Sequence, residues 1–263
     1  MSVKINDIID SMEKYAPHYL AEDWDNVGLM IGERDREVSR ILVALDVNDQ
    51  VIDEAVDSKV DLIITHHPFI FKSIKSVTDE SPLGKRIIKL IRNNIAVFSA
   101  HTNLDAAEGG TNATLAKLLK LENIQGLADI IEDENAAMGR IGDLKDPVTF
   151  EDFVTKVKTV LGVENLSVCG DLTTSVRRVG ICTGKGASYM QAAADMRADV
   201  FITGDFGYHE GQTAVDLGLC VIDGTHYLTE VIVVPVIAGY IADKFKEVEV
   251  ICSEVDGQTL KIV

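Results

Sequence analysis

Histidines in this sequence are concentrated just after segments expected to be strands. Five of the six histidines follow such segments: His66, His67, His101, His209 and His226. Ligands in open α/β sheets bind beyond the carboxyl ends of the strands, where these side chains are expected to lie. Imidazole is the commonest metal ligand in proteins. The distribution therefore predicts a metal site.

The most informative stretch is Val60–Phe69, in which two neighbouring histidines end an apolar run. The unbroken run 60–64 is typical of a strand buried on both faces. Successive strand residues point to opposite faces, so His66 and His67 can serve one site only where the strand has ended. Pro68 favours such an end, because the residue before a proline avoids helical geometry. The alternative is a pair of polar residues that cap a loop.

Carboxylates accompany two of the histidines at a fixed spacing. Asp105 lies four residues after His101, and Glu230 lies four residues after His226. In a helix this spacing brings both side chains to one face, although Pro235 could reduce the second helix to a turn. Imidazole and carboxylate ligands together suit Zn, Mn, Fe, Co or Ni and suit Ca poorly. There are enough ligands for two divalent cations, which paired sites hold about 3.5–4 Å apart.

Two further segments contain residue types that occur in binding sites. Gly184, Lys185 and Gly186 follow a predicted strand and precede a predicted helix, where N–H groups and a lysine could bind phosphate. A tight turn explains the same glycines equally well, and short glycine motifs give frequent false positives. Trp24, the only tryptophan, lies next to turn-forming residues such as Asn26. We expect it to fill a hydrophobic gap in preference to a direct role in chemistry.

The segments that would position these residues occur twice. Residues 60–67 resemble residues 198–205, and residues 95–101 resemble residues 219–226. In each half a β-α-β-α-β order delivers polar residues at strand ends. We therefore expect an α/β protein of two similar three-layer lobes that arose by duplication, with the metal site in the cleft between them.

The boundary between the lobes is predicted in the acidic, weakly periodic stretch 122–147. Residues 1–127 would form the first lobe and residues 128–263 the second. The first lobe would carry His66, His67 and Asp105, and the second would carry His226 and Glu230. Residues 247–252 and 259–263 have the pattern of late strands, placed either at an edge or against the first lobe.

Helix ends are marked at three places. Ser81 followed by Pro82 is typical of a helix start, because serine caps free N–H groups and proline suits the first helical position. Thr149 with Asp152 predicts a second start, and Gly162 predicts where that helix ends.

Composition describes an ordinary globular protein, with 46% hydrophobic and 25% charged residues. The formal net charge of −17 argues against nucleic acid or an anionic membrane as the main partner, and part of it could offset bound cations. The start of the chain lacks the features of a secretory signal, and no run reaches the ~18 apolar residues of a membrane span. The four cysteines are far apart and form no C-x-x-C pair, which predicts free thiols in a reducing compartment. We expect a cytoplasmic protein.

Five segments together resemble the signature segments of the NIF-like dinuclear-metal family, whose members are also called GTP cyclohydrolase I type 2 homologues. They occur in order between Trp24 and Glu230 and are residues 24–29, 64–68, 100–105, 203–205 and 223–230. The chain lacks the long insertion that some members carry between the lobes, so it resembles the short form.

The resemblance implies a ligand set and an assembly. His67 and Asp105 would bind one metal, His66 and His226 would bind the other, and Glu230 would bridge both. The resemblance also implies a ring-shaped homohexamer whose metal sites face an internal cavity.

Three further residues would lie near these ligands. His101 and His209 would be close neighbours that hold a water or move a proton, or that make a structural hydrogen bond. Asp205 would accept a hydrogen bond from a ligand histidine or cap a turn.

Two kinds of function fit these expectations. The first is a GTP cyclohydrolase I type 2-like, metal-dependent hydrolase that acts on a nucleotide-like substrate through a metal-bound hydroxide. The second is a non-catalytic protein, for metal binding, metal insertion or regulatory scaffolding, because a bound metal pair shows a site and not catalysis. Open coordination positions beside a substrate-sized pocket would favour the enzyme, and a fully protein-ligated pair would favour storage or structure.

Overall fold

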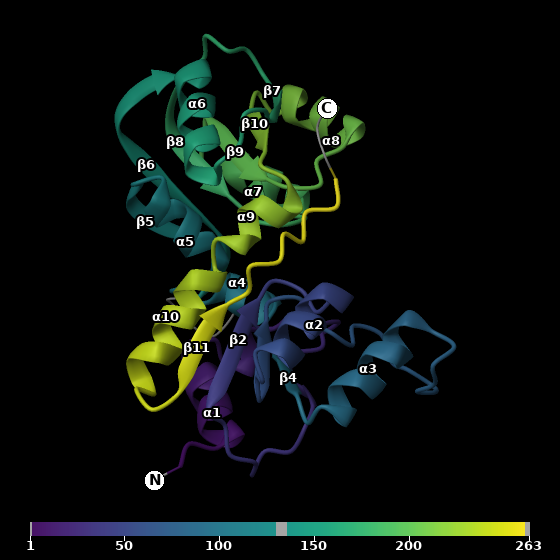
Figure 1. The fold of residues 1–263 in the computed structure, drawn as a ribbon. Coiled ribbons are helices and arrows are strands. Elements are labelled where there is room, and N and C mark those ends of the chain that lie inside the picture. The colour runs from purple at the N-terminus through teal and green to yellow at the C-terminus, as the bar shows by residue number, and fades with distance from the viewer. Residues whose placement is uncertain (1, 130–135, 261–263) are drawn as a thin grey trace. The chain divides into compact units, whose positions relative to one another are not determined.

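The computed structural model describes residues 2–129 and 136–260, which form a mixed α/β protein with two sheets (Figure 1). The chain divides into two compact units. The first unit comprises the residues up to Leu104 together with Val233–Gly257. The second comprises Asp105–Ile232 together with the residues from Gln258 on. The predicted α/β class is confirmed.

The first unit is organised around a mostly parallel sheet. Its described strands are β1 (Gly28–Ile31), β2 (Arg40–Ala44), β3 (Leu62–Thr65), β4 (Ala96–Ser99) and β11 (Glu249–Cys252). Their order is β1-β4-β3-β2-β11, and β1 runs antiparallel to β4 while each of the other neighbouring pairs is parallel. The carboxyl ends of β2, β3 and β4 therefore meet at one edge of the sheet.

Helices surround this sheet. They are α1 (Ile5–Tyr15), the short 3-10 helix η1 (His18–Leu20), α2 (Asp49–Asp57), α3 (Pro82–Arg92) and α10 (Val234–Lys244). Leu42, Ile63 and Val97 pack in one buried cluster with apolar residues of α2 and α3. The alternate strand residues Ile41 and Ile64 are buried as well, so these strands are covered on both faces, as their unbroken apolar runs predict.

The second unit contains a mixed sheet. Its described strands are β5 (Glu122–Asp129), β6 (Ala137–Thr149), β7 (Ser167–Cys169), β8 (Ser175–Ile181), β9 (Val200–Thr203) and β10 (Cys220–Asp223). Their order is β5-β6-β8-β9-β10-β7. Strands β8, β9 and β10 are parallel, and the other neighbouring pairs are antiparallel.

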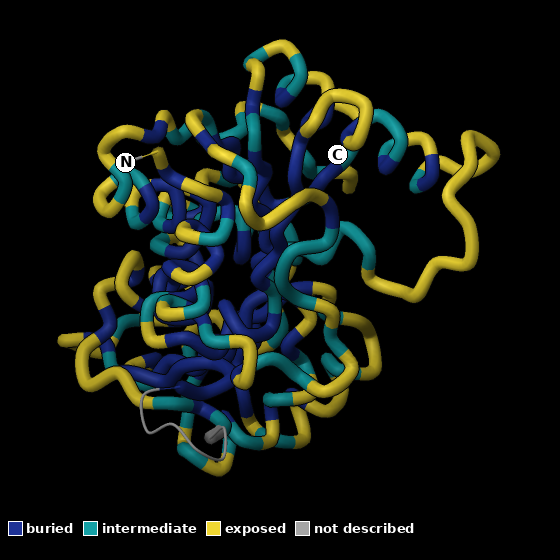
Figure 2. Tube along the Cα trace, turned by 90° about the horizontal axis from the view of Figure 1, so that it is seen from below, coloured by how far each residue is buried: buried dark blue, intermediate teal, exposed yellow. Residues whose placement is uncertain are grey.

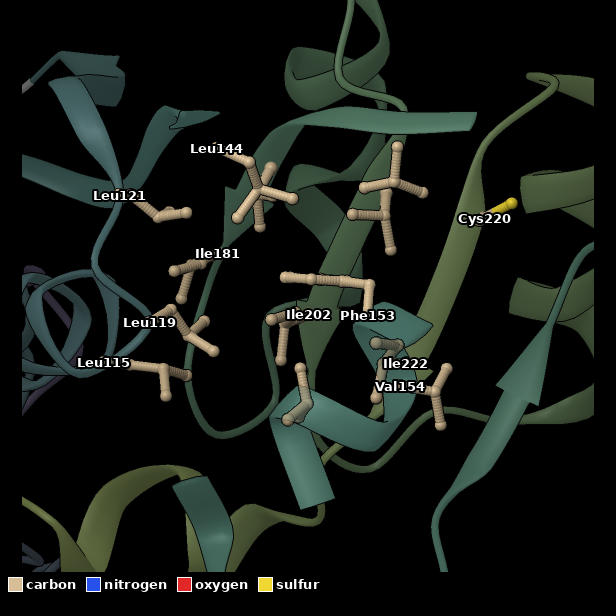
Figure 3. Packing of buried hydrophobic residues seen from close by; sticks show 14 of the residues in the cluster. Leu115, Leu119, Leu121, Leu144, Phe153, Val154, Ile181, Ile202, Cys220 and Ile222 are labelled. Atoms are coloured by element: carbon tan, nitrogen blue, oxygen red, sulfur yellow. The ribbon is translucent and has the colours of Figure 1, made fainter. Parts of the chain in front are cut away.

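Helices lie against both faces of this sheet. They are α5 (Thr111–Leu118), α6 (Phe150–Leu161), the 3-10 helix η2 (Ala187–Tyr189), α7 (Met190–Asp195), α8 (Tyr208–Asp216) and α9 (His226–Val231). Ile202 packs with Leu115 and Phe153 in one cluster (Figure 3). The preceding residue Phe201 packs with Ala193 in another cluster. Because neighbouring strand residues face opposite ways, the two clusters give this unit three layers.

Figure 2 shows the buried residues gathered inside the units and the exposed residues along loops and helix ends. The predicted helix caps are confirmed. The Ser81 side chain accepts a hydrogen bond from Gly84 N, and the Thr149 side chain accepts one from Asp152 N. Gly162 ends α6 with a φ of 70°, a left-handed conformation that favours glycine.

The two units repeat one motif, in agreement with the predicted duplication. Strands β2, β3 and β4 lie side by side in parallel, as do β8, β9 and β10, and each third strand has an antiparallel neighbour. The two units also share an aspartate directly before the middle strand of the three, β3 or β9, that accepts hydrogen bonds from the backbone of the neighbouring segment. Asp61 accepts hydrogen bonds from Ser39 N and Arg40 N. Asp199, at the equivalent position, accepts them from Arg177 N and Arg178 N.

The division of the chain differs from the predicted boundary. Residue 127 lies within β5, and Asp105, expected in the first lobe, belongs to the second unit. The reason is packing, because Leu115 of α5 and Leu119 join Phe150 in the core of the second unit. The acidic stretch 122–147, apart from residues 130–135, which lie outside the described residues, is an antiparallel β5–β6 pair.

The chain returns to the first unit near its end. Residues 249–252 of the predicted late strand form β11, which pairs with β2 in parallel. Helix α10 packs against both of these strands. Of the second predicted strand, residues 259 and 260 have no strand structure, and residues 261–263 lie outside the described residues.

One helical stretch of the described chain, His226–Lys244, is long and apolar enough to cross a membrane, with a mean hydropathy of 1.2. Core helices of globular proteins satisfy the same criterion. In the α10 part of this stretch, Val234, Ile237 and Ile241 are buried. Their burial is explained by packing on β2 and β11, so the stretch is weak evidence for a membrane span.

Candidate metal centre

The first unit brings three histidines together at the carboxyl ends of β3 and β4. His66 and His67 directly follow β3, and His101 lies one residue beyond Ala100, after β4. Each ring offers a nitrogen within 4.8 Å of the other two, a grouping that could hold a metal ion. The ring centroids of His66 lie 5.1 Å from His67 and 5.2 Å from His101. Neighbouring parallel strands explain the convergence, since β3 and β4 end at the same edge.

Each of these imidazoles has Nδ1 beside an oxygen acceptor. His66 Nδ1 lies 3.0 Å from the Ala100 carbonyl, and His67 Nδ1 lies 2.8 Å from Asp46 Oδ1. His101 Nδ1 lies 2.9 Å from Asp25 Oδ1. Since these oxygens accept hydrogen bonds, Nδ1 carries the proton and Nε2 carries the lone pair. Metal-binding histidines have this arrangement, which fixes the tautomer and the ring orientation.

Asp25 is the most firmly held of the acceptors. Its side chain is fully buried, and it also accepts hydrogen bonds from the N–H and the hydroxyl of Thr102. Burial, the largest influence, would raise the pKa of Asp25. The hydrogen bonds from His101 and Thr102, with the nearby His101 charge, outweigh it and lower that pKa to about 2. Asp25 therefore stays ionised and fixes the His101 ring.

In the second unit α9 supplies a histidine and a glutamate. His226 begins the helix and Glu230 lies one turn later, so that Nε2 and Oε2 are 3.1 Å apart. The predicted helical spacing is confirmed. Pro235 does not shorten α9, because it lies in the first turn of a separate helix, α10, where proline is tolerated.

The His226 ring is held as the histidines of the first unit are. Its Nδ1 lies 2.9 Å from Asp205 Oδ2, the contact that the predicted support role of Asp205 requires. The backbone here is strained, because Asp205 and Thr225 have φ values of 52° and 60° without being glycine. Such conformations cost about 1–3 kcal/mol each and cluster at functional sites. These strained residues thus lie at the Asp205–His226 contact.

Asp105 is a buried carboxylate that lies close to Glu230 in the second unit. It lies in α4 (Thr102–Ala106), and its Oδ1 accepts a hydrogen bond from the Thr111 hydroxyl. Asp105 and Glu230 each place a carboxylate oxygen within 4.8 Å of the other, and their residues are only 8% and 3% exposed. Burial first, and these two negative charges next, raise the pKa of the Cys182 thiol. Two buried carboxylates this close call for a cation.

The Gly184–Gly186 turn has a steric role beside Glu230. A Cβ on Gly184 would lie 2.0 Å from Glu230 Oε1 and 3.4 Å from His226 Nε2. The Gly184 N–H donates to the Thr229 hydroxyl, and the Gly186 N–H donates to the Thr203 hydroxyl. The N–H groups of both glycines thus have protein acceptors, and phosphate binding at Gly184, Lys185 and Gly186 stays a prediction.

His209 is set apart from the ligand group of the second unit. It lies on α8, exposed, with Nδ1 3.2 Å from Gln212 Oε1 on the same helix. No metal-binding group found among the described residues includes it. A proton-transfer role for His209 stays a prediction.

Two residues of the centre were not predicted from the sequence. Asp46, which holds His67, lies two residues after β2, and its position near a strand end was the available signal. Asp25, which holds His101, lies between Trp24 and Asn26 in one of the segments that carry the family resemblance. Each of these aspartates contacts a histidine that is distant in sequence, so only the folded chain reveals the pairing.

The donor set of each unit fits a divalent cation. Imidazole nitrogens with Nδ1 already engaged and carboxylate oxygens in buried surroundings suit zinc and the first-row transition metals. The ring nitrogens come from His66, His67 and His226, and the carboxylates come from Asp105 and Glu230. Chemically, such ligands can hold a Lewis acid that polarises a substrate and activates water.

Comparison with known proteins identifies relatives along nearly the whole chain. The sequence signature of Duf34/NIF3 (NGG1p interacting factor 3) matches residues 3–258. A "GTP cyclohydrolase 1 type 2 homolog" of Clostridium perfringens is 38% identical over 228 residues, 87% of each chain. A protein of the same name from Methanocaldococcus jannaschii is 35% identical and covers 87% of this chain and 91% of its own.

Solved structures agree. A Bacillus cereus protein related to NIF3 superimposes with a TM-score of 0.92 at 26% identity, covering 100% of this chain and 99% of its own. Reduced HcgD from Methanocaldococcus jannaschii gives a TM-score of 0.83 at 33% identity, covering 97% and 99%. Alignment with a Listeria monocytogenes relative extends over 342 positions, more than the 263 residues here, as expected when that relative carries inserted residues.

Proposed function

The chain belongs to the Duf34/NIF3 family, and on that premise we propose that it is a metal-dependent hydrolase of a nucleotide-like substrate. The observation that carries the proposal is the shared setting of the ligand histidines. In His66, His67 and His226, Nδ1 lies within hydrogen-bond distance of an oxygen, so Nε2 carries the lone pair that a cation would take. The name of the relatives, GTP cyclohydrolase 1 type 2 homolog, supports a nucleotide as substrate.

In this proposal two divalent cations are bound, drawn from Zn, Mn, Fe, Co and Ni. As the family resemblance implies, His67 and Asp105 would hold one, His66 and His226 would hold the other, and Glu230 would be shared by both. When bound, the pair supplies Lewis acidity and lowers the pKa of a coordinated water toward neutrality. The family resemblance supports this assignment, and the buried carboxylates of Asp105 and Glu230 offer the charge that it needs.

Side chains near the ligands would fix the ligand rings and transfer protons. Asp46 and Asp205 accept the Nδ1 proton of the His67 and His226 rings, which leaves the Nε2 lone pair to bind a cation. His101, fixed by the ionised Asp25, gives or takes a proton at Nε2 as the substrate bond breaks. His209 is a second proton carrier in this proposal.

The test compares metal content and turnover in matched variants. We expect Glu230→Gln to lose most of the metal measured by elemental analysis and to lose turnover of a nucleotide panel. His67→Ala should behave in the same way. Glu164→Gln, at an exposed glutamate outside the centre, should keep both.

Two outcomes would contradict the proposal. Full metal content and full activity in Glu230→Gln would remove this site from consideration. Metal-replete wild type that consumes no nucleotide faster than His67→Ala would favour the other function, a metal-binding or metal-insertion protein without turnover.

We also propose a ring-shaped homohexamer in the cytoplasm, supported by the family resemblance for the ring and by the free thiols for the compartment. Cys169, Cys182, Cys220 and Cys252 all lie in the described chain and are free. Light scattering on purified protein tests the assembly. A mass of about six times the 28.7 kDa chain is expected, and a monomer mass would contradict the ring.

A further inference from the structure

Three aromatic rings of the first unit form a cluster at the edge of its histidines. Trp24 lies 6.0 Å from Phe71 and 6.2 Å from His101, and Phe71 lies 6.4 Å from His101, measured between ring centroids. The interplanar angles are 68°, 75° and 86°, so each pair is edge-to-face. Rings placed at steep angles to one another present faces and edges in several directions.

Two of the three rings are exposed. Trp24 is 59% exposed and Phe71 is 46% exposed. The expectation that Trp24 fills a hydrophobic gap is therefore wrong. Large aromatic side chains left in water at one place, beside polar groups able to do chemistry, are typical of a binding surface.

The exposed rings are also held in place. Asp25, next to Trp24, is anchored by its buried carboxylate to His101 and Thr102. The Asn26 amide donates to the Ile70 carbonyl, which ties the Trp24 loop to the residue before Phe71. A surface ordered before a ligand arrives loses less entropy on binding.

His101 joins this aromatic surface to the metal-binding histidines. Its ring centroid lies 5.2 Å from that of His66 and 5.7 Å from that of His67. His101 is therefore the ring that the aromatic surface and the metal-binding histidines share.

We propose that Trp24 and Phe71 bind the planar heteroaromatic ring of the substrate, a nucleobase, and so determine its specificity. This inference rests on the proposed function and adds the residues that recognise the base. Aromatic faces also attract organic cations. Divalent cations on the neighbouring histidines would repel such a ligand, whereas a neutral planar ring can stack without that cost.

Trp24 reports on its own binding, since it is the only tryptophan. Metal-loaded wild-type protein is titrated with guanosine 5′-monophosphate, and tryptophan emission is followed. Stacking on Trp24 should quench the emission to saturation. Ribose 5-phosphate, which has the sugar and the phosphate but no base, should leave it unchanged, as should choline. Equal quenching by ribose 5-phosphate, or quenching by choline alone, would overturn the proposal.

Variants test the second ring and the alternative of a subunit contact. Phe71→Ala should raise the Kd for the nucleotide on the order of tenfold, the weakening expected from loss of one base–aromatic stack, and Phe71→Tyr should restore it. Ile74→Ala, at another exposed apolar residue of the same loop, should leave the Kd unchanged. All three should keep the wild-type metal content. An unchanged Kd in Phe71→Ala, or a changed oligomeric mass, would overturn the proposal.

The titration does not require turnover, so its failure differs from failure of the proposed function. A protein that hydrolyses nucleotides without quenching refutes the aromatic site alone. A protein that is quenched without hydrolysis refutes the hydrolase alone.

Discussion

In the first unit β3 is followed by His66 and His67, whereas the equivalent strand of the second unit, β9, is followed by Gly204 and Asp205. The reason is steric at the first position. A Cβ on Gly204 would lie 2.6 Å from the backbone nitrogen of His226, so no side chain fits there. At the next position both units have an Asp–His hydrogen bond, but the histidine is at the strand end in the first unit and on α9 in the second.

The segments after β4 and β10 also differ, and here it is the second unit that places a histidine beside a carboxylate of the same segment. His101 with Asp105 and His226 with Glu230 share a four-residue spacing. Only in the second unit does the helix begin at the histidine, and there the imidazole lies 3.1 Å from the carboxylate. The His101 ring instead faces Asp25, at 2.9 Å. The two units therefore share a strand scaffold but place their histidines and the carboxylates that contact them at different positions of it.

The largest loss of stability is expected from a substitution at Gly184 of the second unit, where no side chain fits. Gly184→Ala places a methyl group against the Glu230 carboxylate in a backbone with φ of 60°, and should lower the free energy of unfolding by about 3 kcal/mol and displace bound metal. Urea unfolding and elemental analysis measure the two effects. Gly162→Ala has a similar φ of 70° but no atom within 4 Å, so it should cost only about 1 kcal/mol. Equal losses in both variants would rule out the clash.

The two Asp–His pairs can be compared directly. Asp46→Asn and Asp205→Asn each replace an acceptor that fixes a ligand ring, and each should lower metal affinity by about 10–100-fold. Competition with a chelator gives the affinities. Asp216→Asn, on α8 away from the ligands, is the control. An effect in one unit only would show that the supports are not equivalent.

Asp25 predicts a pH dependence. Its pKa of about 2 in the folded protein lies below the ~3.9 of an unfolded aspartate, so it stabilises the fold above about pH 4. That stability, on the order of 2 kcal/mol, is lost as the pH falls from about 4 through 2. Asp25→Asn should therefore flatten the acid dependence of unfolding in this window. A wild-type slope in the variant would contradict the assignment.

The smallest loss of stability is expected at Asp61 and Asp199, the aspartates that the two units share before β3 and β9. Asp61→Asn weakens hydrogen bonds from the backbone at the start of β2, and Asp199→Asn weakens those from the backbone within β8. Each should cost about 1 kcal/mol. Thermal unfolding monitored by circular dichroism measures the loss. Similar shifts in both variants would support a shared structural origin, and a shift in only one would argue against it.

Much of the fold could be predicted because it depends on local rules. Apolar runs indicated β3 and β9, and the caps at Ser81, Thr149 and Gly162 set helix ends by chemistry within a few residues. The unit boundary could not be found in this way. It depends on which core α5 joins, a matter of packing between segments far apart in sequence.

For the candidate site, too, local features could be predicted from the sequence and long-range contacts could not. Sequence alone determined which residues carry imidazole and carboxylate groups and that they follow strands, because strand periodicity and a four-residue helical spacing are written in local order. Only the tertiary structure decided that Asp46 and Asp25 hold His67 and His101, that Gly184 makes room for Glu230, and that Trp24 is exposed. Each of these depends on through-space contacts between distant segments, whose distances no local pattern encodes.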